Sequence, residues 1–502
     1  MKKKATPSYV LTLKLNTDAS DEAFLDKRFQ LSCKVQNRIV SYARKQMNKM
    51  SSDYRYRQLL EQWHKTGNSH DAATKRRHSD IGKQLSRIRL EYGLSEYQFH
   101  GYVKLQQHRY ASYLGSQACQ RIASAVWRSV EACLYQKGKR IRFHKGTDHA
   151  VLYGAKNNTT YMVFDEQTKT VRVGRKYEIP VEIDPDDLYV CHALQDRVKY
   201  CQIVRKIFFN GYHYYLQLVM EGIPPKKHPV ADGRVGIDIG TSSVAAVSKH
   251  EVRLNVLGQD VPDHSAEIRR LQRAMDRSKR MTNPDRYNKD GTAKHGRRGK
   301  WVFSKSYNIL YARKRTLERK QAAALKQSHE IMANNIIAMG NDIYVEVMNF
   351  KALQRRKKET TRSKTGRFHR KGRFGKSIRS HAPAMLVSII DRKLSYQGTE
   401  IHKINTQTFR ASQYNHITDE YVKKKLGKRS VLIGDIRMQR DLYSAFLLMN
   451  SSSDLCHTDR NRCMETFNDF VTFHNQCMKD LVTRYKNGTR FPTCIGIMDF
   501  AA

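Results

Sequence analysis

The chain has 502 residues, enough for roughly two to four domains with sizeable cores. It carries 92 Lys and Arg residues against 47 Asp and Glu residues, a formal net charge of +45. An excess of this size repels itself unless a polyanion neutralises it, so nucleic acid is the expected partner; a basic soluble protein without such a partner is the weaker interpretation.

The first half of the chain predicts a helical block inserted into a β-rich block. Residues 8–15 alternate apolar and polar side chains and predict a strand that joins a later group of strands. The helical block is expected over 20–136. The β-rich block is expected over 1–19 and 137–228, with an Asn-Gly hairpin at 210–211. The helices are expected at 21–50, 52–90 and 116–135, and the strands at 160–164, 169–174, 178–183, 199–207 and 212–220.

A proline-rich linker predicts a domain boundary near residue 228. Directly after it, residues 234–247 form two apolar runs around a glycine turn, which predicts a buried β-hairpin with one acid, Asp238, in its first strand. Residues 343–348 predict a second buried strand with one acid, Glu346. Helices are expected at 265–280, 302–338, 383–395, from about 440, and at 459–486, and a short strand at 399–405.

The long helix at 302–338 has an apolar residue at every seventh position, which favours an antiparallel helix pair. These residues are Leu310, Leu317, Ala324 and Ile331.

Residues 351–379 hold thirteen Lys or Arg residues and cannot pack a core. Contact with a nucleic-acid backbone is favoured over a merely solvated loop. A smaller basic turn, with Lys139 and Arg140, follows the helix at 116–135. The residues expected to bind nucleic acid in the longer stretch are Arg355, Arg356, Lys357, Lys358, Arg367, Arg370, Lys371 and Arg373.

Three carboxylates stand on predicted structured elements about a hundred residues apart: Asp238, Glu346 and Asp441. In a very basic protein such a trio indicates a two-metal phosphodiesterase, because Mg²⁺ prefers carboxylate oxygens. Asp342 is an alternative to Glu346, and Asp435 to Asp441. Each acid has a second interpretation, as a helix cap or an ion-pair partner. For Asp441 the adjacent residues Arg437 and Arg440 favour that reading.

The segment Gly236-Ile237-Asp238-Ile239-Gly240-Thr241 also resembles the first phosphate loop of the actin, heat-shock ATPase and sugar-kinase superfamily. That superfamily and the superfamily of two-metal nucleases share a ribonuclease-H-like sheet. This segment alone therefore does not distinguish an ATPase from a nuclease. The rest of the chain has no second Asp-x-Gly phosphate loop, and a charge of +45 is unusual for a soluble ATPase.

Taken together, the motifs resemble those of TnpB-type transposon nucleases and of their descendants, the compact type V CRISPR effectors. The resemblance covers most of the chain and is most specific from about residue 229 onward. The segments that carry it are Lys199–Lys206, Gly236–Gly240, Val345–Phe350, Ala411–Gln413 and Gln439–Ala445.

The resemblance implies an RNA-guided DNA endonuclease, with a guide RNA and target double-stranded DNA as partners. Asp238, Glu346 and Asp441 match the acids of the three family nuclease motifs, which would hold two Mg²⁺ ions, or Mn²⁺. The implied fold is multidomain α/β. It combines a ribonuclease-H-like (RuvC) nuclease domain with an N-terminal β-barrel wedge domain and a helical recognition insert. The alternative function is RNA-guided DNA binding without cleavage. Both a monomer and a dimer of the protein per guide RNA are compatible with the resemblance.

Within this scheme the nuclease domain comprises residues 229–410 and 436–502, and residues 411–435 are a reduced nucleic-acid-binding insert. The family usually has a four-cysteine zinc ribbon there, but no cysteine lies between 413 and 441, so no structural zinc is expected. Core thiols are favoured over a displaced metal site for the later cysteines and histidines. These are Cys456, His457, Cys463, His474 and Cys477.

Nine cysteines without a C-x₂-C pair fit a reduced intracellular compartment, and no apolar run is long enough for a transmembrane helix. The basic N-terminus is followed by polar residues and does not predict a secretory signal. The resemblance implies a prokaryotic cytoplasmic protein associated with the nucleoid.

Replacing Arg367, Arg370, Lys371 and Arg373 by Gln should reduce the slope of log K against log salt by about 3 for duplex DNA, because each lost phosphate contact releases one fewer counterion. Fluorescence anisotropy across a salt series measures this slope. A control variant with Thr360, Thr361, Ser363 and Thr365 replaced by Ala should keep it. An unchanged slope in the first variant would contradict the assignment.

Overall fold

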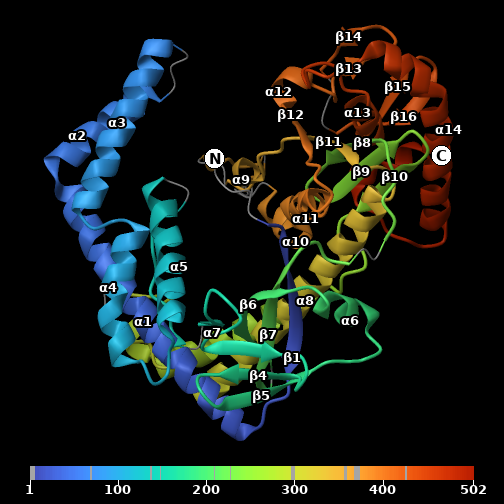
Figure 1. The fold of residues 1–502 in the computed structure, drawn as a ribbon. Helices are drawn as coiled ribbons and strands as arrows, with labels where there is room; N and C mark the ends of the chain where they lie inside the picture. The colour runs from blue at the N-terminus through green and yellow to red at the C-terminus, as the bar shows by residue number, and fades with distance from the viewer. Residues whose placement is uncertain are drawn as a thin grey trace. The chain divides into compact units, whose positions relative to one another are not determined.

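A computed structural model of the chain describes residues 6–67, 71–135, 138, 140–146, 149–208, 210–225, 228–294, 300–355, 359–363, 365–366, 374–423 and 427–501. The chain divides into two compact units, Met1–Pro225 and Lys226–Ala502. The division lies close to the proline-rich linker. Figure 1 shows both units as mixtures of helices and strands. In the described parts of the chain, none of the helices combines the length and the apolar character needed to cross a membrane.

The first unit contains a seven-stranded antiparallel sheet in the order β2-β6-β7-β1-β5-β4-β3. The N-terminal strand β1 lies in the middle, paired with β5 on one side and β7 on the other, as its alternating pattern predicts. The sheet curls so that its last strand, β3, returns to β6, where the Cys201 thiol donates to the Met162 carbonyl across 3.2 Å. The strands are β1 (Ser8–Leu15), β2 (Val151–Tyr153), β3 (Met162–Asp165), β4 (Thr170–Val173), β5 (Tyr177–Glu182), β6 (Val198–Phe208) and β7 (Gly211–Glu221).

Helices α1 to α5 of the first unit lie between β1 and β2. Helix α1 begins with a capping box, in which the Asp18 and Asp21 side chains each accept from the other residue's backbone N–H. The stretch 52–90, predicted as helical, forms two helices, each starting at an aspartate cap, Asp53 or Asp71. The helices are α1 (Ala19–Ser52), α2 (Tyr54–Thr66), α3 (Ala72–Glu91), α4 (Glu96–Arg109), α5 (Ser116–Leu134) and, after β5, α6 (Leu188–Leu194).

The second unit is built on a five-stranded mixed sheet in the order β10-β9-β8-β11-β12. The predicted hairpin is confirmed: β8 and β9 are antiparallel, and the Gly240 N–H donates to the Ser243 carbonyl across 2.8 Å. Strands β11 and β12 run parallel to β8. The strands are β8 (Arg234–Ile239), β9 (Ser243–Ser248), β10 (Val252–Val256), β11 (Asp342–Glu346) and β12 (His402–Ile404).

Helices cover both faces of this sheet. Alternate residues of β8, such as Val235 and Ile237, pack against helices α8 and α11, whereas the other face of the sheet packs against α13 and α14. Burial on both faces explains why β9 is apolar or small along its whole length. The helices are α7 (Ser265–Thr282), α8 (Lys305–Ile337), α9 (Phe350–Leu353), α10 (Gly375–His381), α11 (Pro383–Ser395), α12 (Thr406–Phe409), α13 (Arg440–Met449) and α14 (Arg460–Lys486).

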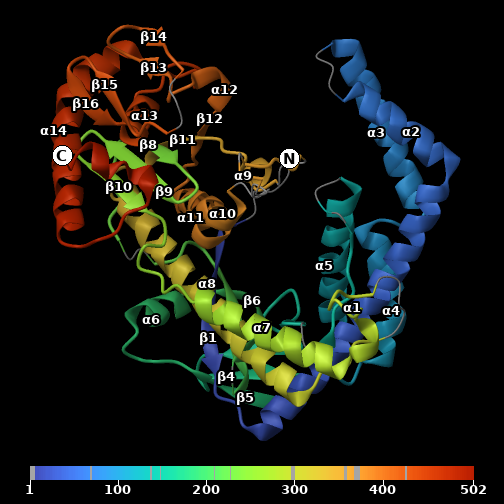
Figure 2. The ribbon, with the colours of Figure 1, turned by 180° about the vertical axis from the view of Figure 1, so that it is seen from behind.

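Helices α7 and α8 lie alongside each other, with Arg313 and Glu267 paired at 2.9 Å, and Figure 2 shows the two helices together. The predicted seven-residue seam is wrong in the C-terminal half of α8, where Ile331 is 54% exposed. There the helix buries Leu325, Ala333 and Ile336 instead. The reason is that these turns face the sheet and α11 rather than α7.

The region 411–439 forms two small hairpins. Their apolar residues Ala411, Tyr414, Val431 and Ile433 join the cluster around α13. The hairpins are β13 (Tyr414–Asn415) with β14 (Glu420–Tyr421), and β15 (Ser430–Ile433) with β16 (Ile436–Gln439).

Helix α13 approaches strand β8 unusually closely at Gly236. A Cβ atom at this position would collide with the Ala445 carbonyl oxygen and the Met449 nitrogen of α13. Only glycine therefore allows the backbone of the helix to rest on the backbone of the strand.

Gly236→Ala should destabilise the second unit by about 3 kcal/mol, because the helix backbone cannot move away without unpacking α13 from the sheet. Urea unfolding with a probe in this unit measures the change. Gly427→Ala is the matched control, since nothing lies within 4 Å of a Cβ there, and it should change stability by less than about 0.5 kcal/mol. Equal stability of the two variants would refute the close-approach argument.

Candidate active site

The three predicted acids come from three elements that meet on one face of the sheet. Asp238 lies near the carboxyl end of β8, and Glu346 is the last residue of β11. The two strands are parallel, with Ile237 opposite Val345, so the same register places Asp238 beside Glu346 one residue further on. The carboxyl ends of the two strands thus bring these two acids to the same edge of the sheet.

The third acid reaches this edge through the contact at Gly236. Asp441 lies in the first turn of α13, one helical turn before Ala445. Ala445 rests on Gly236, and Asp238 lies two residues along the strand on the same face. The close packing of helix on strand therefore carries Asp441 towards Asp238.

The placement of the acids shifts the pKa of two of them. Burial, and then repulsion from Asp441 and Glu346, raise the pKa of Asp238 well above its usual value. Burial raises the pKa of Glu346 to about 7, while a hydrogen bond from the Ala411 backbone acts in the opposite direction. A proton or a cation is needed to relieve this concentration of buried negative charge.

Two arginines offset part of this charge. Arg440 contacts the Asp441 carboxylate with 3.1 Å between nitrogen and oxygen, and both side chains are only 14% exposed. Arg440 and Arg429 also act to lower the pKa of Asp238. The ion pair anticipated as the alternative role of Asp441 therefore exists, although with Arg440 alone, because Arg437 donates to the Asp499 carbonyl instead.

The start of α13 is held by a buried glutamine. The Gln439 side chain caps the helix by accepting from the Leu442 N–H across 2.7 Å, and its backbone N–H donates to the His474 ring across 2.9 Å. Sequence reasoning assigned no role to Gln439, Arg429 or Ala411. Gln439 and Ala411 lie in segments that carried the family resemblance, whereas the only signal for Arg429 was the basic pair Lys428-Arg429.

The competing acids lie elsewhere. Asp342 is the first residue of β11, at the opposite end from Glu346, and contacts His402 at 2.9 Å and Arg234 at 3.5 Å. Asp435 is exposed in the turn between β15 and β16. Of the candidates, Glu346 and Asp441 are the acids that act on Asp238.

A divalent metal ion fits the chemistry of this site. Within the described ranges, no three His, Cys, Asp or Glu side chains are already arranged as a metal-binding group. The repulsion that Asp441 and Glu346 exert on Asp238 is nevertheless what a cation would relieve, and the three half-buried acids could share it. Carboxylate oxygens with water are the ligands that Mg²⁺ prefers. Asp238, Glu346 and Asp441 would be the protein ligands.

Most of the predicted nucleic-acid contacts cannot be placed. Arg140 and Arg355 are described, and both are exposed. The remaining eight lie outside the described residues: Lys139, Arg356, Lys357, Lys358, Arg367, Arg370, Lys371 and Arg373.

The C-terminal cysteines and histidines occupy separate environments. Cys463 is buried in the cluster around α13, and burial raises the pKa of its thiol. Burial also raises the pKa of the Cys477 thiol to about 11, so both thiols stay protonated at neutral pH. Cys456 and His457 lie before α14, where the His457 ring contacts Asp454 at 3.3 Å.

Comparison with known proteins gives little. No family model matches the chain, and no curated protein matches it. Among solved structures, the chain is similar to one described as a cryo-EM structure of a CRISPR-Cas12f ternary complex, with 12% identity over 87% of this chain and 86% of that chain. The TM-score is 0.22, too low to support an argument about fold or function.

Without metal, the pKa of Glu346 predicts a pH-dependent stability. Its carboxyl has a higher pKa in the folded chain, about 7, than in the unfolded chain, about 4.5, so the folded state holds the extra proton between these values. Stability should therefore fall by up to about 3 kcal/mol as the pH rises from 4.5 to 7. Urea unfolding in EDTA should show a smaller fall for Glu346→Gln. Identical pH profiles for the two proteins would contradict the assigned environment.

Proposed function

We propose that this protein is an RNA-guided DNA endonuclease with one RuvC-like active site formed by Asp238, Glu346 and Asp441. The observation that carries the proposal is geometric: the register of β8 and β11 and the packing of α13 on Gly236 bring these three acids to one edge of a mixed sheet. The sequence motifs that contain them resemble those of TnpB-type nucleases and compact type V CRISPR effectors. The five-stranded sheet with helices on both faces is consistent with the ribonuclease-H-like domain that this resemblance implies.

The site divides its tasks between acids and arginines. Asp238, Glu346 and Asp441 would hold two Mg²⁺ ions, or Mn²⁺. When bound, the ions supply Lewis-acid catalysis of phosphodiester hydrolysis. Arg440 and Arg429 keep positive charge beside the acids, which favours the approach of a phosphate group. The Ala411 N–H helps to keep Glu346 ionised.

The rest of the chain would hold the nucleic acids. A charge of +45 can neutralise the backbones of a guide RNA and a target duplex, while base pairing between guide and target strand supplies sequence specificity. The curled seven-stranded sheet would serve as the wedge domain, and α1 to α5 as the recognition insert. Residues 411–435, with β13 to β15, would form the reduced insert without zinc.

Asp238→Asn, Glu346→Gln and Asp441→Asn should each slow cleavage of matched double-stranded DNA on the order of a thousandfold, because each removes an anionic metal ligand. EDTA should stop cleavage by the unmodified complex. The assay uses the protein purified with its own RNA, which is sequenced to define the target. Asp435→Asn, exposed in a hairpin turn, is the control and should cleave normally.

Binding of the same target separates the possible outcomes. Target binding that is unchanged in all three variants, with cleavage lost, supports the catalytic assignment. Binding of RNA and target without cleavage by the unmodified protein would instead indicate a guided DNA-binding protein. Undiminished cleavage by Asp238→Asn would refute the site.

A further inference from the structure

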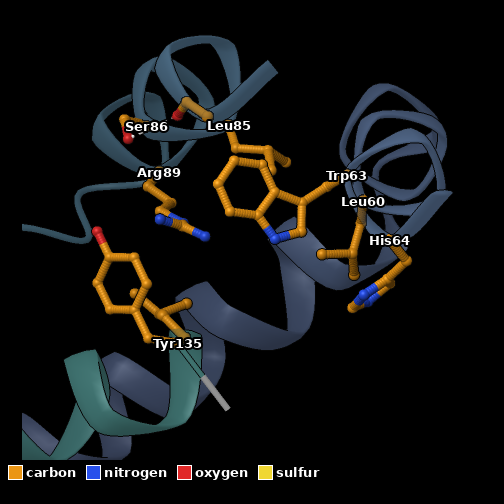
Figure 3. Close-up of a pocket in the computed structure, with 9 residues that line it drawn as sticks. Leu60, Trp63, His64, Leu85, Ser86, Arg89 and Tyr135 are labelled. Atoms are coloured by element: carbon orange, nitrogen blue, oxygen red, sulfur yellow. Dashed lines mark hydrogen bonds between the residues drawn. The ribbon is translucent and has the colours of Figure 1, made fainter. Parts of the chain in front are cut away.

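A pocket of about 430 Å³ lies in the first unit, between the α2–α3 helix pair and the end of α5. Its walls include the apolar side chains of Leu60, Leu85 and Leu134, with Trp63 and Tyr135 as aromatic residues, and its cation is Arg89. Figure 3 shows the Arg89 guanidinium reaching into the space between the Tyr135 ring and the Trp63 indole. A volume of this size suits a small ligand or one group of a larger one.

Among the described residues, the guanidinium of Arg89 has no anionic partner. The residue is only 9% exposed, and within the described part of the chain its Nε atom has no hydrogen-bond partner and its guanidinium no ion pair. Its guanidinium carbon lies 5.0 Å from the centre of the Tyr135 ring. A buried guanidinium without a carboxylate is costly, and an anionic ligand that enters the pocket would remove that cost.

The Trp63 side of the pocket is held in place by its neighbours within the protein. The Trp63 indole stacks on His78 with ring centroids 3.6 Å apart, and the His78 ring in turn contacts the Thr66 hydroxyl at 2.9 Å. Gly82 gives the indole room, because a Cβ atom there would lie 2.7 Å from the Trp63 ring. A rigid aromatic surface of this kind binds a flat ring at little cost in conformational entropy.

The geometry points to a binding pocket for one unpaired nucleotide of a single-stranded nucleic acid. The base packs between the leucines, Trp63 and Tyr135, and the Arg89 guanidinium binds the phosphate of the same nucleotide. A nucleotide combines a flat ring with an anionic phosphate. The pocket offers apolar walls for the ring and the Arg89 guanidinium for the phosphate. The inference deepens the proposed function, on whose need for nucleic acid it rests, by giving the helical block a specific contact.

Photocrosslinking tests this pocket directly. Single-stranded RNA and DNA 12-mers that carry one 5-iodouracil are irradiated with the full-length protein, freed of bound nucleic acid, and the adducts are mapped by mass spectrometry. Adducts are expected on Trp63 or Tyr135, and whether RNA or DNA gives more identifies the strand. UMP should compete for them better than inorganic phosphate does. Arg89→Ala and Arg89→Lys should lower their yield about tenfold, since Lys retains the charge but lacks the planar fork.

Arg87→Ala is the matched control, an exposed cation on the same helix, and should keep the wild-type yield. Thermal unfolding of each variant checks that the fold is retained, and Arg89→Lys keeps the test open if Arg89→Ala does not fold. Adducts found only elsewhere, an unchanged yield in both folded Arg89 variants, or equal competition by phosphate would overturn the inference. The assay needs neither guide RNA nor cleavage, so failure here and failure of the nuclease assignment are distinguishable.

Discussion

The contact between helix α13 and strand β8 at Gly236 is the constraint on which the second unit depends. Because this glycine has no side chain, the helix backbone can rest on the strand, and the two elements then share one face of the sheet. Asp441 lies one helical turn before the contact residue Ala445 on α13, and Asp238 lies two residues after Gly236 on β8. The packing that closes the core therefore also brings Asp441 to Asp238. In this unit, stability and the geometry of the candidate site rest on the same few atoms.

The site carries negative charge that the surrounding protein only partly balances. Burial disfavours the ionised form of Asp238 and of Glu346, and the acidic neighbours of Asp238 disfavour it further. Arg440 pairs with Asp441. When ionised, the three acids outnumber the two arginines beside them, Arg440 and Arg429, inside a chain of charge +45. A small divalent cation relieves such a site better than a further arginine would, because it can be shared among several carboxylate oxygens without filling the space that a phosphate group must enter.

Much of this arrangement could be predicted from sequence. Uninterrupted apolar runs with one acid each indicated β8 and β11, and the apolar periodicity of α13 placed Asp441 in its first turn. The apolar pattern could not predict which other residues lie near the acids. Arg429 and Ala411 reach them only through the folding of residues 411–439, which have no strong periodicity. The seven-residue pattern of α8 failed for a related reason. Ile331 fits a seam with α7, but the sheet and α11, which the local sequence does not reveal, bury Ala333 and Ile336 instead. Local pattern identifies elements, and tertiary contacts decide which faces they bury.

Arg89 and Arg440 show how differently the same side chain can be used. Arg440 is buried beside a carboxylate that its own helix supplies, so its charge is balanced within the chain. Arg89 is buried beside aromatic and apolar side chains, and no carboxylate among the described residues pairs with it. An arginine that is already paired with a carboxylate adds little net positive charge to its surroundings. An arginine without such a partner attracts an anion. The two arginines thus differ in what balances their charge, a carboxylate of the same helix for Arg440 and, in our proposal, the phosphate of a bound nucleotide for Arg89.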